Sequence, residues 1–147
     1  MKLLGKNLMR HDSIFRILNI FWPAILVFTL HIFLTHVVNA YLLLPWIDIP
    51  MHYLGGLSMA CSLLLGLTYL QEHKQITQLD RVIELLLVFT LVTSIAVFWE
   101  FSEFSMDQLL GTNVQISLQN TMQDLFMGIM GASTIVSYKF IRHFAVN

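Results

Sequence analysis

The sequence predicts an all-α polytopic membrane protein with four transmembrane helices in an up-down bundle. Of its 147 residues, 56% are hydrophobic and only 12% are charged, and its mean hydropathy is +0.71. Soluble domains carry roughly twice this share of charged residues. Because one crossing of the bilayer takes ~20 apolar residues, the chain has room for about four crossings and for no separate soluble domain. We therefore expect a single integral membrane domain over residues 1–147.

The predicted spans follow from the longest apolar stretches, which are residues 17–44, 51–70, 82–105 and 120–140. Helices are expected because open sheets and loops leave backbone groups unsatisfied in lipid, and no segment alternates polar and apolar residues like a barrel strand. Pro45, Pro50 and Gly111 lie in the connectors, where chain breakers are expected. Short connectors favour antiparallel neighbours, which gives the up-down bundle.

The basic residues predict the orientation. They precede the first span, separate the second from the third, or end the fourth: Lys2, Lys6, Arg10, Arg16, Lys74, Arg81, Lys139 and Arg142. Since short basic loops stay in the cytoplasm, both termini are predicted to be cytoplasmic. A cleaved signal peptide is the alternative, but the first apolar run exceeds the roughly 7 to 15 residues of a signal peptide, so an uncleaved helix is expected. The basic segment 1–16 is expected to lie on the inner anionic membrane surface.

Composition also excludes some functions. The net charge of -1 provides no broad basic face for nucleic acid, and the single Cys61 excludes an intrachain disulfide or a multi-cysteine metal site. Membrane lipids are the expected partners. Gly56 with Ala60 and Gly128 with Ala132 have the spacing of small residues that lets helices approach closely. These faces can pack within the chain or form a homo-oligomer.

The acidic residues supply the main functional signal. Five of them, together with one histidine, lie at the end of the spans that carries no basic residue: Asp48, His52, Glu100, Glu103, Asp107 and Asp124. A carboxylate near the bilayer centre costs about 2.5 to 3.5 kcal/mol, so Glu100 and Asp124 should face the bundle interior or a wet cavity. Glu100, Glu103 and Asp107 share one helix face. Asp48, an N-cap candidate, lies one turn before His52.

Carboxylates that converge with one imidazole and no cationic side chain can bind a metal, hold protons, or stay hydrated at the headgroup boundary. Hard oxygen ligands favour Mg, Ca, Mn, Fe or Zn, so a divalent metal ion is the candidate cofactor. Its candidate ligands are Asp48, His52, Glu100, Glu103 and Asp124. In an enzyme, Glu103 or His52 would accept the proton.

Two alternatives stay open beside the metal site. A proton or cation path would need polar steps toward the inner side, and Thr93, Thr90 and Glu84 are the candidates on the third span. A purely structural polar cluster is the other. His31 and His36 lie in the first span ~140° apart, so they cannot both face one ligand. His36 lies nearer the acidic end and could join the site, but a core histidine bonded to a neighbouring helix is its expected role.

Two strings carry a resemblance to a known family: DIPMHYLGGLSMA at 48–60, and FWEFSEFSMDQLLGTNVQISLQNTMQDLFMGIMGAS at 98–133. They resemble the YjdF-type bacterial inner-membrane family of unknown function and, more distantly, the VanZ-like superfamily. The matching positions are Asp48, His52, Gly55, Trp99, Glu100, Glu103, Gln115 or Gln119, Thr121, Asp124, Gly131 and Ala132. Asn120 stands where the family usually has Asp, which removes one carboxylate.

The resemblance implies no settled activity, because the YjdF-type family has none. VanZ proteins are associated with low-level resistance to teicoplanin, so the more distant likeness points to envelope lipids, cell-wall precursors or antibiotic tolerance. The matching residues fall at the acidic end that the charge distribution identifies independently. A site that binds a divalent cation or the polar head of an envelope lipid is the resulting prediction.

Overall fold

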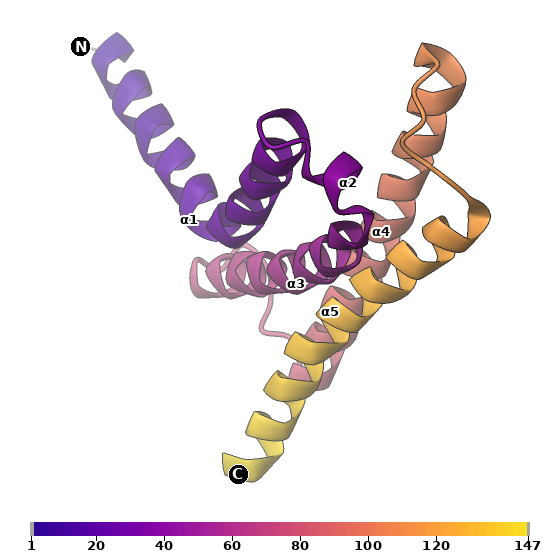
Figure 1. Ribbon diagram of the computed structural model, residues 1–147. Helices are drawn as coiled ribbons and strands as arrows, with labels where there is room; N and C mark the ends of the chain where they lie inside the picture. The colour runs from indigo at the N-terminus through magenta and orange to yellow at the C-terminus, as the bar shows by residue number, and fades with distance from the viewer. Residues whose placement is uncertain (1, 147) are drawn as a thin grey trace.

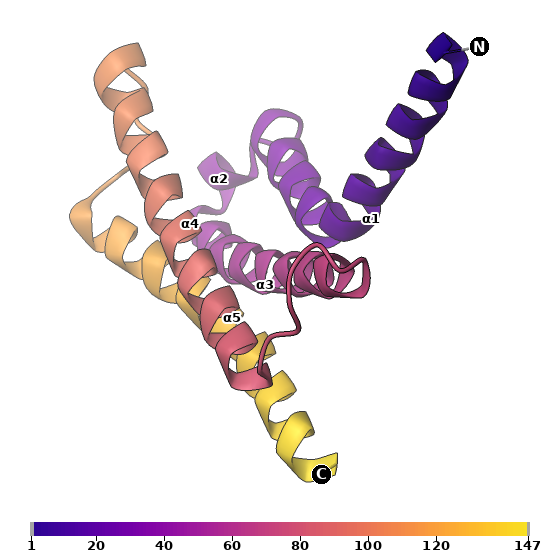
Figure 2. The ribbon, with the colours of Figure 1, turned by 180° about the vertical axis from the view of Figure 1, so that it is seen from behind.

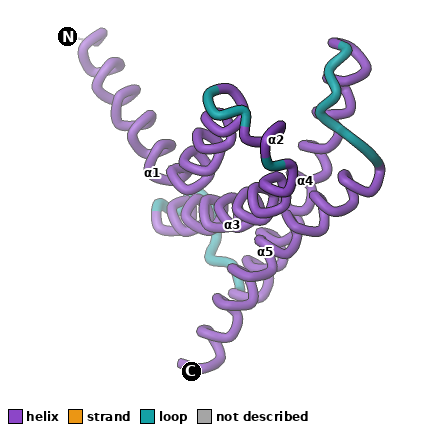
Figure 3. Tube along the Cα trace, viewed as in Figure 1, coloured by secondary structure: helices purple, strands orange, loops and turns teal. Residues whose placement is uncertain are grey.

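The computed structural model describes residues 2–146, and the side chains of residues 14–145, as a set of helices joined by short connectors (Figures 1 and 3). The elements are α1 (Lys2–His36), α2 (Ala40–Leu43), the 3-10 turn η1 (Pro45–Ile47), α3 (Asp48–Glu72), α4 (Arg81–Leu110) and α5 (Leu118–Val146). The described part of the chain contains no strand, which confirms the all-α prediction.

Three segments are long and apolar enough to cross a membrane, namely Ile14–His36, Pro45–Glu72 and Arg81–Leu110. The fourth predicted span, 120–140, lies in α5, which is long enough, but the first turns of this span contain the polar Asn120, Gln123 and Asp124. A fourth crossing and the cytoplasmic position of both termini stay predictions.

The first predicted span, 17–44, is wrong at its end. α1 stops at His36, and Asn39 turns the chain with a left-handed backbone (φ 52°), a conformation that asparagine tolerates better than most residues. The short α2 and η1 follow. α1 is also strongly bent, and the arm before the bend points away from the other helices (Figures 1 and 2). Pro23 accounts for the bend, because proline lacks the N–H of the helix ladder and its ring clashes with the preceding turn.

α3 is the central helix and packs against α1, α4 and α5. It crosses α5 at close range, because a Cβ at Gly56 would lie 1.9 Å from the carbonyl oxygen of Gly128, and a Cβ at Gly131 would lie 2.0 Å from that of Tyr53. From this crossing the helices splay apart (Figures 1 and 2), and the up-down topology stays a prediction. The homo-oligomer stays a prediction, and the Gly56 and Gly128 faces are already occupied within the chain.

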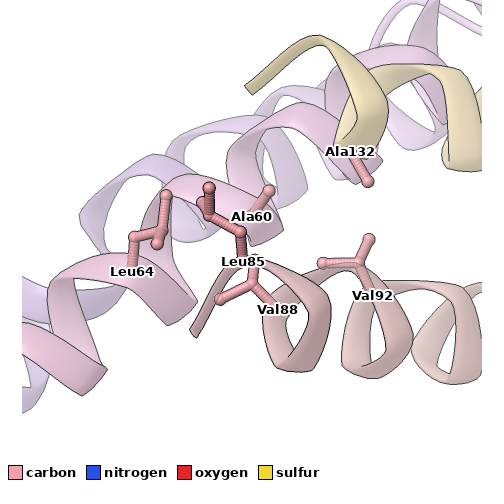
Figure 4. Close-up of a cluster of buried hydrophobic side chains, with 6 residues drawn as sticks. All are labelled: Ala60, Leu64, Leu85, Val88, Val92 and Ala132. Atoms are coloured by element: carbon pink, nitrogen blue, oxygen red, sulfur yellow. The ribbon is translucent and has the colours of Figure 1, made fainter. Parts of the chain in front are cut away.

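The hydrophobic core lies along the halves of α3, α4 and α5 that carry no acidic cluster. Figure 4 shows the six buried side chains that form it: Ala60, Leu64, Leu85, Val88, Val92 and Ala132. At its far end, Glu84 is buried, pairs with Arg81 and accepts a hydrogen bond from Gln71 Nε2 (3.3 Å). The hydrogen bond from Gln71 to Glu84 ties α4 to the end of α3.

Candidate functional site

His52 lies at the centre of a cluster of charged side chains from three helices. Its Nε2 is 3.3 Å from Asp48 Oδ1, one turn earlier on α3, and 3.8 Å from Asp124 Oδ1 on α5. Its Nδ1 is 3.9 Å from Glu100 Oε1 on α4. We call these four residues the His52 cluster. The structure thus brings together four of the five predicted metal ligands.

The glycine crossing of α3 and α5 positions this cluster. Gly56 lies one turn after His52, and Gly128 lies one turn after Asp124. Because these two glycines are in backbone contact, the side chains one turn away on the same faces are also drawn together. The cluster therefore depends on the absence of a Cβ at the crossing point.

Asp48 was expected to cap the helix, and the structure corrects this. The N-cap of α3 is Ile47, since η1 runs directly into the helix, and Asp48 lies in the first turn. A carboxylate there is favoured by the helix dipole. Both carboxylate oxygens of Asp48 contact residues of the site: Oδ1 faces His52, and Oδ2 accepts a hydrogen bond from Asn120 Nδ2 (3.2 Å).

Asn120 joins the two aspartates of the cluster. Its Nδ2 also donates to Asp124 Oδ2 at 2.7 Å, so a single amide nitrogen holds one oxygen of each carboxylate. The remaining oxygens, Oδ1 of Asp48 and of Asp124, are the ones that face His52 Nε2. Asn120 therefore acts as a neutral bridge between the two carboxylates.

Two carboxylate oxygens of the cluster are buried without a hydrogen-bond partner among the described residues. They are Asp124 Oδ1 and Glu100 Oε2, and their residues are only 1% and 6% exposed. Buried polar atoms in proteins are nearly always satisfied, so such a group calls for a bound ion, a water or a proton. Asp124 Oδ1 is also one of the atoms that face His52.

Asp48, His52 and Asp124 form a group that could hold a metal ion. One ligand atom of each residue lies within 4.8 Å of the others. Metal–ligand bonds of about 2.1 Å place neighbouring ligands about 3.0 to 3.4 Å apart in octahedral or tetrahedral geometry. The distance of 3.3 Å from His52 Nε2 to Asp48 Oδ1 falls in this range, and the 3.8 Å to Asp124 Oδ1 is somewhat longer.

Glu103, the fifth predicted ligand, is not part of this group. Its Oε1 accepts a hydrogen bond from Trp99 Nε1 at 2.7 Å, one turn earlier on α4. The assignments of Glu103 and of Glu100 as metal ligands, and of Glu103 or His52 as proton acceptor, stay predictions.

Asp107 has a local structural role. Its carboxylate accepts hydrogen bonds from Thr112 Oγ1 (2.6 Å) and from the backbone N–H groups of Val114 (2.8 Å) and Gln115 (2.9 Å). It thereby fixes the connector between α4 and α5, which Gly111 starts with a left-handed backbone (φ 67°). The fixed connector places the Gln115 side chain against Glu100.

A cavity of about 150 Å³ opens beside the cluster between α1, α3 and α4. Asp48 and His52 line one end, and most of the other lining side chains are apolar, among them Val27, Val92 and Ile95. The cavity therefore combines a charged end with a long apolar wall.

The sequence did not assign His31 and Tyr41 to this region. His31 Nδ1 and Tyr41 Oη are 2.7 Å apart, and both residues line the cavity. Tyr41 lies outside the candidate spans; burial raises the pKa of its hydroxyl, so it stays protonated and can donate this hydrogen bond. The turn at Asn39 brings Tyr41 back against α1, and no periodicity in the sequence reveals such a reversal.

Comparison with known proteins places the chain in a family. It matches the family described as predicted membrane protein (DUF2238) over residues 6–144, and it belongs to that family. No curated protein and no solved structure matches it. The match confirms that the chain is a membrane protein, whereas the YjdF-type and VanZ-like resemblances stay predictions.

Proposed function

We propose that this member of the DUF2238 family binds a divalent cation with Asp48, His52 and Asp124. The observation that carries the proposal is the buried, unpartnered Oδ1 of Asp124, which faces the same ring nitrogen of His52 as Asp48 Oδ1 does. A cation among these atoms would satisfy the orphaned oxygen and balance the charges of the two carboxylates. Two carboxylates and one imidazole suit Mn²⁺, Zn²⁺, Fe²⁺ or Mg²⁺.

Glu100 has a supporting role in this proposal. When His52 Nε2 ligates the ion, its Nδ1 carries the proton and points toward Glu100 Oε1. Histidine ligands are commonly oriented in this way by a carboxylate, and loss of such a partner weakens metal binding by about 10- to 100-fold. An enzymatic role on a lipid-linked head group would then use Glu103 as the proton acceptor, because both nitrogens of His52 are engaged.

The distribution of charge supports a position of this site toward the outer side of a bacterial inner membrane. The sequence has no Lys or Arg in residues 17–73 or 82–138, so every basic residue lies outside these two segments. The rule that basic loops stay inside therefore favours cytoplasmic termini and an outward site.

A proton or cation path receives less support. The buried Val92, Val88 and Leu85 lie in order along α4 between the cluster and Glu84. The hydroxyls of Thr93 and Thr90 donate to backbone carbonyls of their own helix. Proteoliposomes are expected to show no ion flux, and a flux that Asp124→Asn abolishes would favour transport instead.

Metal analysis of protein purified in dodecyl maltoside tests the proposal. After incubation with Mn²⁺ and gel filtration, the wild type should retain about one ion per chain, and Asp124→Asn should retain far less. Glu72→Gln removes an exposed carboxylate at the other end of α3 and is the matched control, which should bind like the wild type. Equal retention by the wild type and Asp124→Asn would overturn the proposal.

A further inference from the structure

The cavity beside the His52 cluster has the two-part character of a lipid site. Its lining on α3 runs from Asp48 to Met59, which is about 16 Å at 1.5 Å per residue. The charged end is at the start of α3, and the apolar part extends along the helix toward the core. A membrane lipid has the same order of parts: a polar head, then an apolar chain that runs into the bilayer.

The size of the cavity suits the first part of one chain. An apolar cavity of about 150 Å³ takes up a benzene molecule, so the space accommodates about six carbon atoms. Val27 of α1 and Val92, Ile95 and Ala96 of α4 contribute to its wall. α1 packs along α3, and its Phe28 and His31 rings meet α4 at Trp99.

We propose that the cavity binds a zwitterionic phospholipid of the ethanolamine type, with its phosphate on the bound cation and one acyl chain along the apolar wall. This inference rests on the proposed cation site. Asp48, His52 and Asp124 supply three ligands, which leaves open positions on an ion that takes four to six. A phosphate oxygen is a suitable ligand for such a position.

The charges select the head group. An anionic lipid would place uncompensated negative charge near Glu100 and Glu103, where the sequence offers no Lys or Arg. An ammonium group on the same head would balance those carboxylates. A phosphate with a tethered amine therefore matches the site better than a phosphate alone. The hydrogen-bonded His31 and Tyr41 lie where the polar head meets the chain, and they offer polar contacts there.

Phosphorus coupling to bound Mn²⁺ tests the inference directly. The protein is loaded with Mn²⁺ in dodecyl maltoside, which contains no phosphorus, and ³¹P electron-nuclear double resonance is recorded after addition of phosphatidylethanolamine, phosphatidylglycerol or inorganic phosphate. Gly55→Leu fills the cavity, since a Cβ at Gly55 meets no atom within 4 Å. Gly55→Ala changes the same residue but leaves most of the cavity open.

We expect a strong phosphorus coupling with phosphatidylethanolamine in the wild type and in Gly55→Ala, and a loss of at least tenfold in Gly55→Leu at unchanged Mn²⁺ content. Three results would overturn the lipid assignment. The coupling could survive in Gly55→Leu, it could be equally strong with phosphatidylglycerol, or inorganic phosphate alone could produce it at the same concentration. Bound Mn²⁺ without any phosphorus coupling would overturn this inference alone. Failure to bind Mn²⁺ at all would overturn the cation site, and this inference with it.

Discussion

Alanine at Gly56 should disrupt the cation site without touching any charged residue. The new Cβ would lie 1.9 Å from the carbonyl oxygen of Gly128, whereas ordinary contacts begin near 3.4 Å. α3 and α5 must therefore separate by about 1.5 Å at the crossing. One turn away, that shift would widen the 3.8 Å between His52 Nε2 and Asp124 Oδ1 to about 5 Å, beyond the reach of one shared ion.

The neighbouring glycine provides the matched control. A Cβ at Gly55 meets nothing within 4 Å, so Gly55→Ala should gain helix propensity of about 1 kcal/mol without any clash. Gly56→Ala has the same propensity gain but carries an overpacking cost of about 1 to 3 kcal/mol or more. The two variants therefore differ only in what the added methyl group meets.

The assay is a Mn²⁺ titration that follows the free ion by electron paramagnetic resonance, with thermal unfolding recorded by tryptophan fluorescence. We expect Gly55→Ala to bind like the wild type and to melt at the same or a higher temperature. Gly56→Ala should melt lower and bind at least tenfold more weakly. Binding by Gly56→Ala within twofold of Gly55→Ala would refute the link between the glycine crossing and the site.

Three further predictions test the neighbourhood of the site and the orientation of the chain. Asn120→Asp replaces a donor to two carboxylates by a third carboxylate, so the metal-free protein should melt at a lower temperature than the wild type. Mn²⁺ should then raise the melting temperature of Asn120→Asp more than that of the wild type. Equal increases would contradict the bridging role of Asn120. Asp107→Asn should loosen the connector 111–117, seen as faster hydrogen exchange there, yet leave Mn²⁺ content unchanged. In a Cys61→Ser background, Thr112→Cys should react with an impermeant maleimide in intact cells and Gln75→Cys only after lysis, and the opposite pattern would invert the proposed orientation.

The helical class and most of the site were predictable because each follows from local spacing and from the cost of charge in a membrane. The cost of charge in a membrane predicts that Glu100 and Asp124 face the bundle interior, and the structure places both beside His52. The crossing of α3 and α5 was anticipated only as a small-residue spacing, since the sequence does not say which two helices use it.

The features that the sequence does not predict depend on how the chain folds back on itself. The end of α1 was set too late because the segment after His36 is apolar, and apolar character alone does not reveal a left-handed turn at Asn39. Tyr41 reaches the cavity only through that turn. Asp107 was grouped with the acidic face by its helical position, but its oxygens are taken by the connector that follows, which no helical projection includes.

Asn120 bears on whether the bound ion is permanent or exchangeable. With aspartate at this position, three carboxylates would converge, and their repulsion in the metal-free state would need an ion or protons to hold the helices together. Asparagine instead donates to both Asp48 and Asp124, so α3 and α5 remain linked when the site is empty. The glycine crossing provides a second link that does not depend on any ion. A site that stays assembled without its cation can release the ion and bind it again. A cation that recruits a lipid head group needs such exchange, whereas a cation that only maintains the fold does not.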